Sequence, residues 1–138
     1  MTSISTDRTT NRPPGSLPGR VARTSAAVLA VLVVLQAGLA GGALEGQADL
    51  TTIHGTVGLT LIFGLSLTAM IAAARARRHG DSGVPVALCV FGFLAVIAQI
   101  GLGYARVLAA HFPLGVTIGL IYAATALLNG RRTPGVSS

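Results

Sequence analysis

The chain has 138 residues, of which 51% are hydrophobic and only 10% are charged. This number of charged side chains is too small to cover the surface of a water-soluble domain. We therefore expect lipid to surround most of the chain. The net charge of +6 comes from ten arginines, which in a soluble protein would favour nucleic acid as a partner. Because these arginines lie between long apolar segments, we expect a lipid bilayer and no nucleic acid.

Four uncharged segments are long enough to cross a membrane. The charged residues leave gaps of 21, 25, 24 and 24 residues, and a spanning helix needs about 20. The predicted spans are residues 21–44, 50–74, 84–104 and 108–129. They form one domain over residues 21–130, flanked by a disordered tail over residues 1–20 and a short tail over residues 131–138.

Nine of the ten arginines gather on one side of the predicted membrane. They precede the first span, follow the second and follow the fourth, which is the positive-inside pattern for an even number of spans: Arg8, Arg12, Arg20, Arg23; Arg75, Arg77, Arg78; Arg131, Arg132. Both termini are therefore expected in the cytoplasm, with the protein in the plasma membrane. Three short connections predict an all-α, up-down-up-down four-helix bundle.

The two halves of the chain resemble each other. Gln36 aligns with Gln99 when the first span is laid over the third, and His54 aligns with His111 when the second is laid over the fourth. Both histidines begin a His-x-x-x-Gly pattern. The glutamine and histidine are 18 residues apart in the first half and 12 in the second, a difference that falls in an outer loop. This pattern predicts two helix pairs related as a parallel repeat.

The two aligned histidines are the main candidates for function, because ionisable side chains inside a membrane are costly. Counting at 1.5 Å per residue, His54 and His111 each lie about 6 Å inside the outer edge of their spans. Two imidazoles that meet inside a four-helix bundle can supply both axial ligands of a haem iron. The pair predicts one haem b per chain, near the outer leaflet. A structural role for both histidines at the membrane interface stays open.

Five further residues surround this predicted site. Gly58 and Gly115, one turn deeper than the histidines, either admit a flat macrocycle or let the helices pack closely. Gln36 and Gln99 either line a haem or quinone pocket or join helices by hydrogen bonds. Arg106, on the outer side, either pairs with a haem propionate or reaches lipid phosphates.

The glutamines and the two His-x-x-x-Gly patterns resemble one four-helix half of the haem A synthase family, over residues 21–129. They are also similar to a group of small four-helix membrane proteins of unassigned function. The resemblance implies that His54 and His111 pair around a haem. The catalytic half of that family has a glutamate shortly before its first histidine, where this chain has Thr51, Thr52 and Ile53. The resemblance therefore implies haem binding rather than the family's oxidative chemistry.

Together these features predict a bis-histidine haem b protein that transfers electrons or handles haem. It is a redox carrier or binding protein rather than a complete enzyme, with no catalytic residue assigned. Its expected partner is a quinone or a membrane redox protein, and the sequence specifies no oligomeric state. The alternative is a haem-free membrane scaffold or accessory subunit. A small transporter is disfavoured because no acidic residue lies within a span and the repeat is not inverted.

Overall fold

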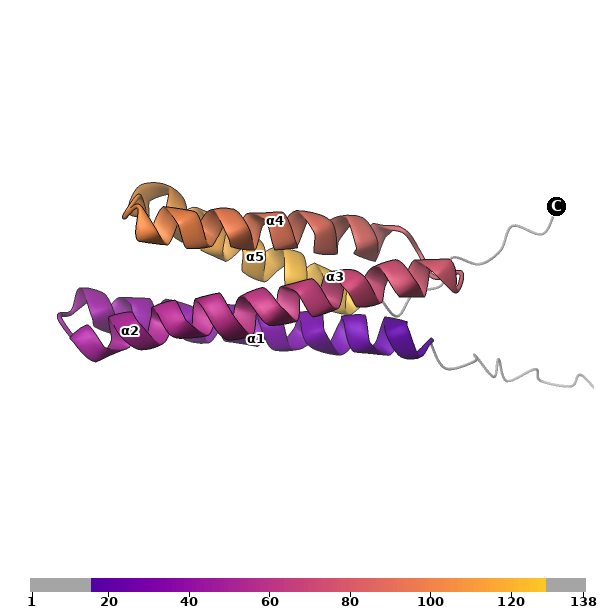
Figure 1. Cartoon of the computed structure of the whole chain (residues 1–138), viewed down its shortest axis with the longest axis horizontal. Coiled ribbons are helices and arrows are strands. Elements are labelled where there is room, and N and C mark those ends of the chain that lie inside the picture. The colour runs from indigo at the N-terminus through magenta and orange to yellow at the C-terminus, as the bar shows by residue number, and fades with distance from the viewer. Residues whose placement is uncertain (1–15, 129–138) are drawn as a thin grey trace, which may run out of the picture.

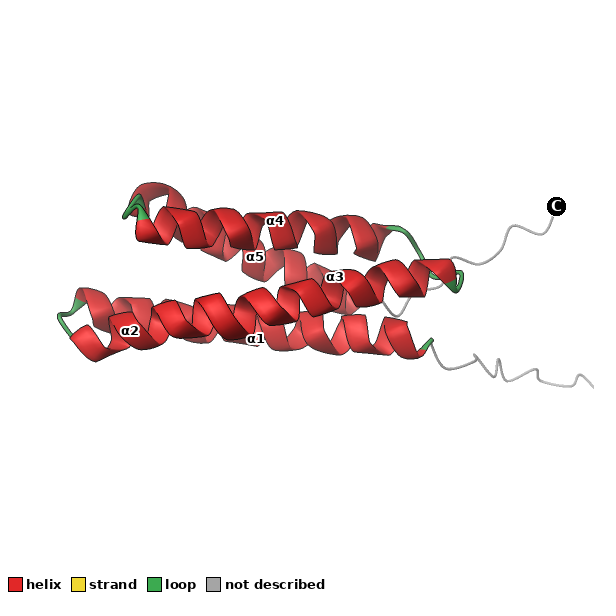
Figure 2. Cartoon of the chain, in the orientation of Figure 1, coloured by secondary structure: helices red, strands yellow, loops and turns green. Residues whose placement is uncertain are grey.

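A computed structural model describes residues 16–128, and within that range every regular element is a helix (Figures 1 and 2). The helices, in chain order, are α1 (Leu17–Leu44), α2 (Ala48–Val57), the π-helix η1 (Gly58–Ile62), α3 (Phe63–Arg78), α4 (Val84–Tyr104) and α5 (Leu108–Leu128). Segments α2, η1 and α3 follow one another without a break and form one continuous span.

The described chain has four helices that are long and apolar enough to cross a membrane: Leu17–Leu44, Ala48–Arg78, Val84–Tyr104 and Leu108–Leu128. This confirms the prediction of a multi-pass membrane protein with four spans. The predicted tails, apart from residues 16–20, lie outside the described residues. Arg8, Arg12, Arg131 and Arg132 lie outside them as well.

The first helix begins at Leu17, four residues before the predicted start of the span. The Ser16 hydroxyl accepts a hydrogen bond of 3.2 Å from the Gly19 backbone N–H, and Pro18 occupies the first turn, where its missing N–H is not needed. The same hydroxyl donates a 2.8 Å hydrogen bond to Asp81 in the α3–α4 turn. Local capping thus extends α1 beyond its apolar segment and ties its start to that turn.

The helices form a four-membered ring in cross-section. Each of α1 and α4 packs against both α3 and α5, whereas the diagonal pairs, α1 with α4 and α3 with α5, have no Cα atoms within 8 Å of each other. The α1–α2 and α4–α5 turns lie at one end of the bundle, and the α3–α4 turn lies at the other (Figure 1). We call the first the histidine end, because His54 and His111 lie there, and the second the basic end.

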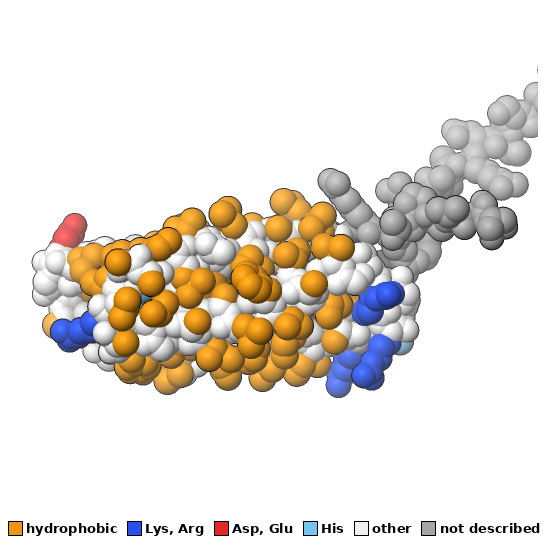
Figure 3. Space-filling model, turned by 90° about the horizontal axis from the view of Figure 1, so that it is seen from above, with side chains coloured by type: hydrophobic (Ala, Val, Ile, Leu, Met, Phe, Trp, Pro, Cys, Tyr) orange, Lys and Arg blue, Asp and Glu red, His pale blue; other side chains and the backbone are white. Residues whose placement is uncertain are grey.

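Small side chains form most of the bundle core. Ala22 and Ala26 of α1 and Ala69 of α3 are fully buried, which lets these helices approach closely in the absence of a hydrophobic driving force between them. Large apolar side chains instead cover the outside of the bundle (Figure 3). Such a surface suits lipid rather than water. Charged residues are confined to the two ends, and the basic end carries Arg20, Arg23, Arg75, Arg77 and Arg78.

Candidate functional site

The two aligned histidines meet across the centre of the bundle. His54 lies on α2 and His111 on α5, and these helices have no Cα atoms within 8 Å of each other. Their imidazole rings nevertheless approach to 6.0 Å between centroids, with an angle of 57° between the ring planes. His111 is buried and His54 is half-buried. The two side chains therefore span a gap that the backbone of α2 leaves open at the histidine end.

Each imidazole is held by a main-chain carbonyl from its own half of the chain. His54 Nδ1 lies 3.1 Å from the Gln36 carbonyl oxygen, and His111 Nδ1 lies 3.1 Å from the Gln99 carbonyl oxygen. A carbonyl only accepts hydrogen bonds, so each Nδ1 must carry the proton. This tautomer leaves a lone pair on both Nε2 atoms. A backbone carbonyl bonded to the opposite ring nitrogen is the usual support of a metal-binding histidine.

The two glutamine side chains differ in their bonding. Gln36 is 92% buried, and its amide nitrogen donates a 2.9 Å hydrogen bond to the His54 carbonyl oxygen, so this residue makes the predicted interhelical bond. No comparable bond is formed by the Gln99 amide nitrogen within residues 16–128. The Oε1 atoms of both glutamines are buried and have no hydrogen-bond partner among the described residues. Gln36 therefore fixes α2 to α1 through side chain and main chain, whereas Gln99 uses only its main chain.

Three glycines make room for these polar groups. A Cβ atom at Gly58 would lie 3.2 Å from the Gln36 amide nitrogen, and one at Gly115 would lie 3.0 Å from the Gln99 amide nitrogen. A Cβ at Gly103 would lie 3.1 Å from Cε1 of His111. Gly58 and Gly115 thus each make room for the glutamine side chain of their own half. This contact is a form of the close helix packing that was one of the two roles expected for these glycines.

Both histidine-bearing helices are irregular just beyond the histidine. The π-helix η1 begins four residues after His54, and Pro113 interrupts the hydrogen-bond ladder of α5 two residues after His111. In each half a threonine bonds back to the carbonyl four residues earlier, Thr60 to Thr56 at 2.7 Å and Thr117 to Pro113 at 2.9 Å. Such bonds often bend helices. The backbone hydrogen bonding is therefore altered close to the histidine in both halves, by a π-helix in one and by a proline in the other.

The available ligands fit a haem better than a small metal ion. Residues 16–128 contain no group of three or more histidine, cysteine, aspartate or glutamate side chains that could hold a metal, whereas protein zinc and copper sites usually need three or four such ligands. Two metal–imidazole bonds of about 2 Å, with each ring centre about 1 Å behind its nitrogen, place the centroids about 6 Å apart. The observed 6.0 Å matches this spacing.

Arg106 lies apart from these groups. It occupies the α4–α5 turn with a positive φ of 56°, is exposed, and forms no ion pair within the described part of the chain. Its position at the histidine end leaves its guanidinium available to anionic groups at the membrane surface.

Sequence reasoning missed a second polar cluster, which lies between the histidines and the basic end. Ser66, Cys89, Tyr122 and Thr125 are all fully buried. The Thr125 hydroxyl bonds to the Ile121 carbonyl at 2.8 Å, and the Ser66 hydroxyl bonds to the Phe63 carbonyl at 2.8 Å. The Tyr122 hydroxyl lies near Ser66 and Cys89 but forms no hydrogen bond within the described residues. The signal was a tyrosine inside an apolar span.

The chain matches no protein-family model, no curated protein and no solved structure.

Proposed function

We propose that this protein binds one haem b, with His54 and His111 as its two axial ligands. The observation that carries the proposal is the facing pair of imidazoles on diagonal helices, 6.0 Å apart, with each Nδ1 engaged by a main-chain carbonyl. This arrangement leaves both Nε2 atoms unprotonated, which a histidine needs in order to bind a metal. The resemblance to one half of the haem A synthase family implies the same pairing.

Filling both axial positions suits a haem to electron transfer rather than to oxygen binding. The protein's own contribution is to hold the ligands. Gln36 and Gln99 fix the histidine tautomers through their carbonyl oxygens, and Gly103 gives His111 the space it needs. Arg106 is the residue best suited to an outer propionate. A quinone or a membrane redox protein would complete the electron path, and a role in haem handling uses the same site.

We propose that the basic end of the bundle, and with it both termini, lies on the cytoplasmic side of the plasma membrane, because that end carries most of the arginines. The histidine end then lies near the outer leaflet.

We further propose that the up-down-up-down bundle arose by duplication of a helix pair. The equal 3.1 Å histidine contacts and the two threonine back-bonds at corresponding positions support this origin.

The alternative is a haem-free scaffold or accessory subunit. One observation favours it: the hydrogen bonds of Gln36 to His54 join α1 to α2 whether or not a ligand is bound. In that case the histidines would be structural. Replacing them would leave assembly with partner proteins unchanged, and no cofactor would be lost.

An absorption spectrum separates these proposals. Full-length protein purified from haem-sufficient cells should show a Soret band and the α and β bands of low-spin haem b, with about one haem per chain. His54→Ala and His111→Ala should each lose the low-spin signature. His79→Ala is the matched control, because His79 is exposed at the basic end, and it should keep the wild-type spectrum. Purified wild-type protein without a Soret band would reject haem binding.

A further inference from the structure

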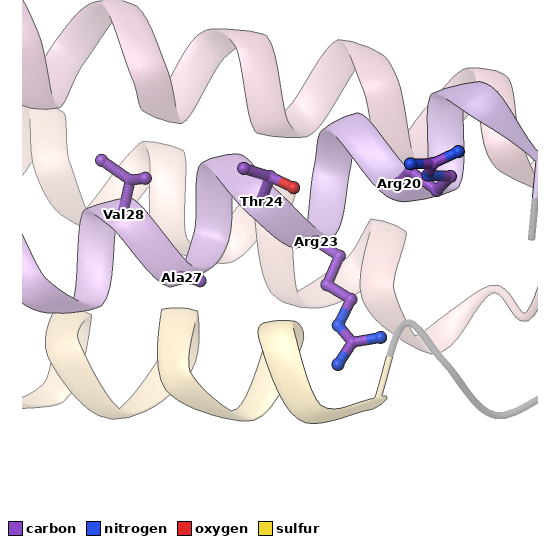
Figure 4. Close-up of a pocket in the computed structure, with 5 residues that line it drawn as sticks. All are labelled: Arg20, Arg23, Thr24, Ala27 and Val28. Carbon is purple, nitrogen blue, oxygen red and sulfur yellow. The ribbon is translucent and has the colours of Figure 1, made fainter.

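A hollow of about 320 Å³ lies on α1 near the basic end (Figure 4). It is lined by Arg20, Arg23, Thr24, Ala27 and Val28, which are spaced to share one helix face and are all exposed. Neither guanidinium has an ion-pair partner within residues 16–128. Two positive charges that form no ion pair within residues 16–128 therefore border an open hollow near the end of the span.

The residues of this hollow are ordered by polarity along the helix axis. The two arginines lie nearest the end of the span, the Thr24 hydroxyl comes next, and the apolar Ala27 and Val28 lie deeper. From Arg20 to Val28 the rise is about 12 Å. A phospholipid has the same order along its length, from charged phosphate through polar ester groups to acyl chains. The hollow thus matches a lipid in both polarity and direction.

Two guanidinium groups border the hollow, one from Arg20 and one from Arg23. Arg20 and Arg23 leave α1 on different sides of the hollow, and Arg23 extends toward the last turn of α5 (Figure 4). Guanidinium groups bind phosphate oxygens by paired hydrogen bonds, more specifically than an ammonium group does. The surrounding arginines of the basic end also attract a headgroup that carries net negative charge.

We propose that this hollow binds one anionic phospholipid, with its phosphate between Arg20 and Arg23 and an acyl chain along Ala27 and Val28. The site is separate from the histidine pair and does not depend on haem binding. A neighbouring hollow between α1 and α3 contains a single arginine, Arg75, and lacks the paired guanidinium groups.

Native mass spectrometry of the full-length protein, titrated in detergent with phosphatidylglycerol or phosphatidylcholine, tests this site. Wild-type protein should retain one phosphatidylglycerol in preference to phosphatidylcholine. The variant R20Q/R23Q should bind phosphatidylglycerol at least about tenfold more weakly, because it loses the charge-assisted hydrogen bonds to the phosphate. The matched control R77Q/R78Q removes the same charge from the same end but no contact in the hollow, so its loss of binding should be several-fold smaller.

Three results would overturn the proposal. Equal losses in R20Q/R23Q and R77Q/R78Q would mean that lipid is attracted only by the overall charge. Equal binding of the two lipids by wild type would exclude charge selection. Displacement of bound phosphatidylglycerol by millimolar glycerol phosphate would assign the site to a free phosphate instead. Circular dichroism of each variant should keep the wild-type helical signal, so that weaker binding is not a folding defect.

Discussion

Tyr122 is fully buried, and its hydroxyl has no hydrogen-bond partner among residues 16–128. A buried polar group left unpaired costs about 1–3 kcal/mol. We expect Tyr122→Phe to raise the free energy of unfolding by about 1 kcal/mol, measured by SDS titration in mixed micelles. Tyr104→Phe should have no measurable effect, because Tyr104 is 74% exposed. A clear loss of stability in Tyr122→Phe would mean that the hydroxyl is bonded, for example through a buried water molecule.

Gly92 is the position where added volume should be least tolerated. A Cβ atom there would lie 3.0 Å from the ring of Tyr122 and 3.2 Å from Cγ2 of Ile121. The ring cannot move aside, because it is fully buried. Overpacking of this kind costs about 1–3 kcal/mol, against a gain of up to about 1 kcal/mol for replacing glycine in a helix.

We therefore expect Gly92→Ala to lower the free energy of unfolding by about 1–2 kcal/mol. Gly101→Ala, on the same helix, is the matched control, because its Cβ would meet nothing within 4 Å. The same SDS titration should find Gly101→Ala as stable as wild type or slightly more stable. Equal stability of the two variants would contradict the close contact between α4 and α5 at Gly92.

At the scale of elements, Gly58 and Gly115 occupy matching positions but should not respond equally to alanine. The tighter contact is at Gly115, where Cβ would lie 3.0 Å from the Gln99 amide nitrogen, against 3.2 Å at Gly58. The Gln99 amide nitrogen has no bond within the described chain and can turn away. The Gln36 amide nitrogen is bonded to the His54 carbonyl and cannot move without losing that bond.

The shorter contact is at Gly115, but we expect the alanine substitution at Gly58 to be the more destabilising of the two. Gly58→Ala should be less stable than Gly115→Ala by about 1 kcal/mol, the net value of one hydrogen bond. If haem is bound, Gly58→Ala should also perturb the low-spin spectrum more, since Gln36 supports His54 twice. Chemical denaturation and absorption spectra of the two variants make this comparison. The reverse order of stability would show that the Gln36–His54 bond contributes little.

The four spans could be predicted from the sequence because charged residues stand at or near the ends of each apolar segment. Predicted and observed ends coincide at Leu44, Val84, Tyr104 and Leu108. The differences arise where local bonding outweighs hydropathy: the Ser16 cap starts α1 early, and the second span continues to Arg78. Neither the π-helix η1 nor its position next to His54 was predicted, because a π-helical turn has no distinct residue pattern.

Part of the candidate site could not be predicted for a different reason. The alignment indicated that Gln36 and Gln99 matter, but it directed attention to their side chains. Their shared contact with histidine is made by main-chain carbonyls, a group that every residue carries. The alignment therefore identified two positions that contact the histidines, but not the main-chain groups that make the contacts. The pairing of His54 with His111 was expected, and their rings do meet.

At the scale of the whole molecule, the bundle separates its polar groups by level. The histidine pair lies at one end, the Tyr122 cluster lies further toward the basic end, and five of the six described arginines lie at that end itself. Short connections alone did not fix which helices are diagonal. The observed ring, in which α1 and α4 each contact α3 and α5, is what allows His54 and His111 to face each other across the centre.

The charge difference between the two ends predicts the orientation in the cell. Cysteines introduced at Gln47, in the α1–α2 turn, and at His79, in the α3–α4 turn, are suitable probes because both positions are exposed. The single native cysteine, Cys89, is buried, so wild-type protein serves as the unlabelled blank. In intact cells a membrane-impermeant maleimide should label Gln47→Cys and spare His79→Cys, because arginine-rich connections stay in the cytoplasm.

Opening the membrane should make both cysteines react, which shows that the failure of His79→Cys to label in intact cells reflects sidedness rather than burial. Labelling of His79→Cys alone in intact cells would show that the orientation is the opposite one, with the histidine pair near the cytoplasmic leaflet. Labelling of both would imply a mixed topology. The expected result places the histidine pair, our proposed haem site, near the outer leaflet, and the arginine pair of α1 at the level of cytoplasmic-leaflet phosphates.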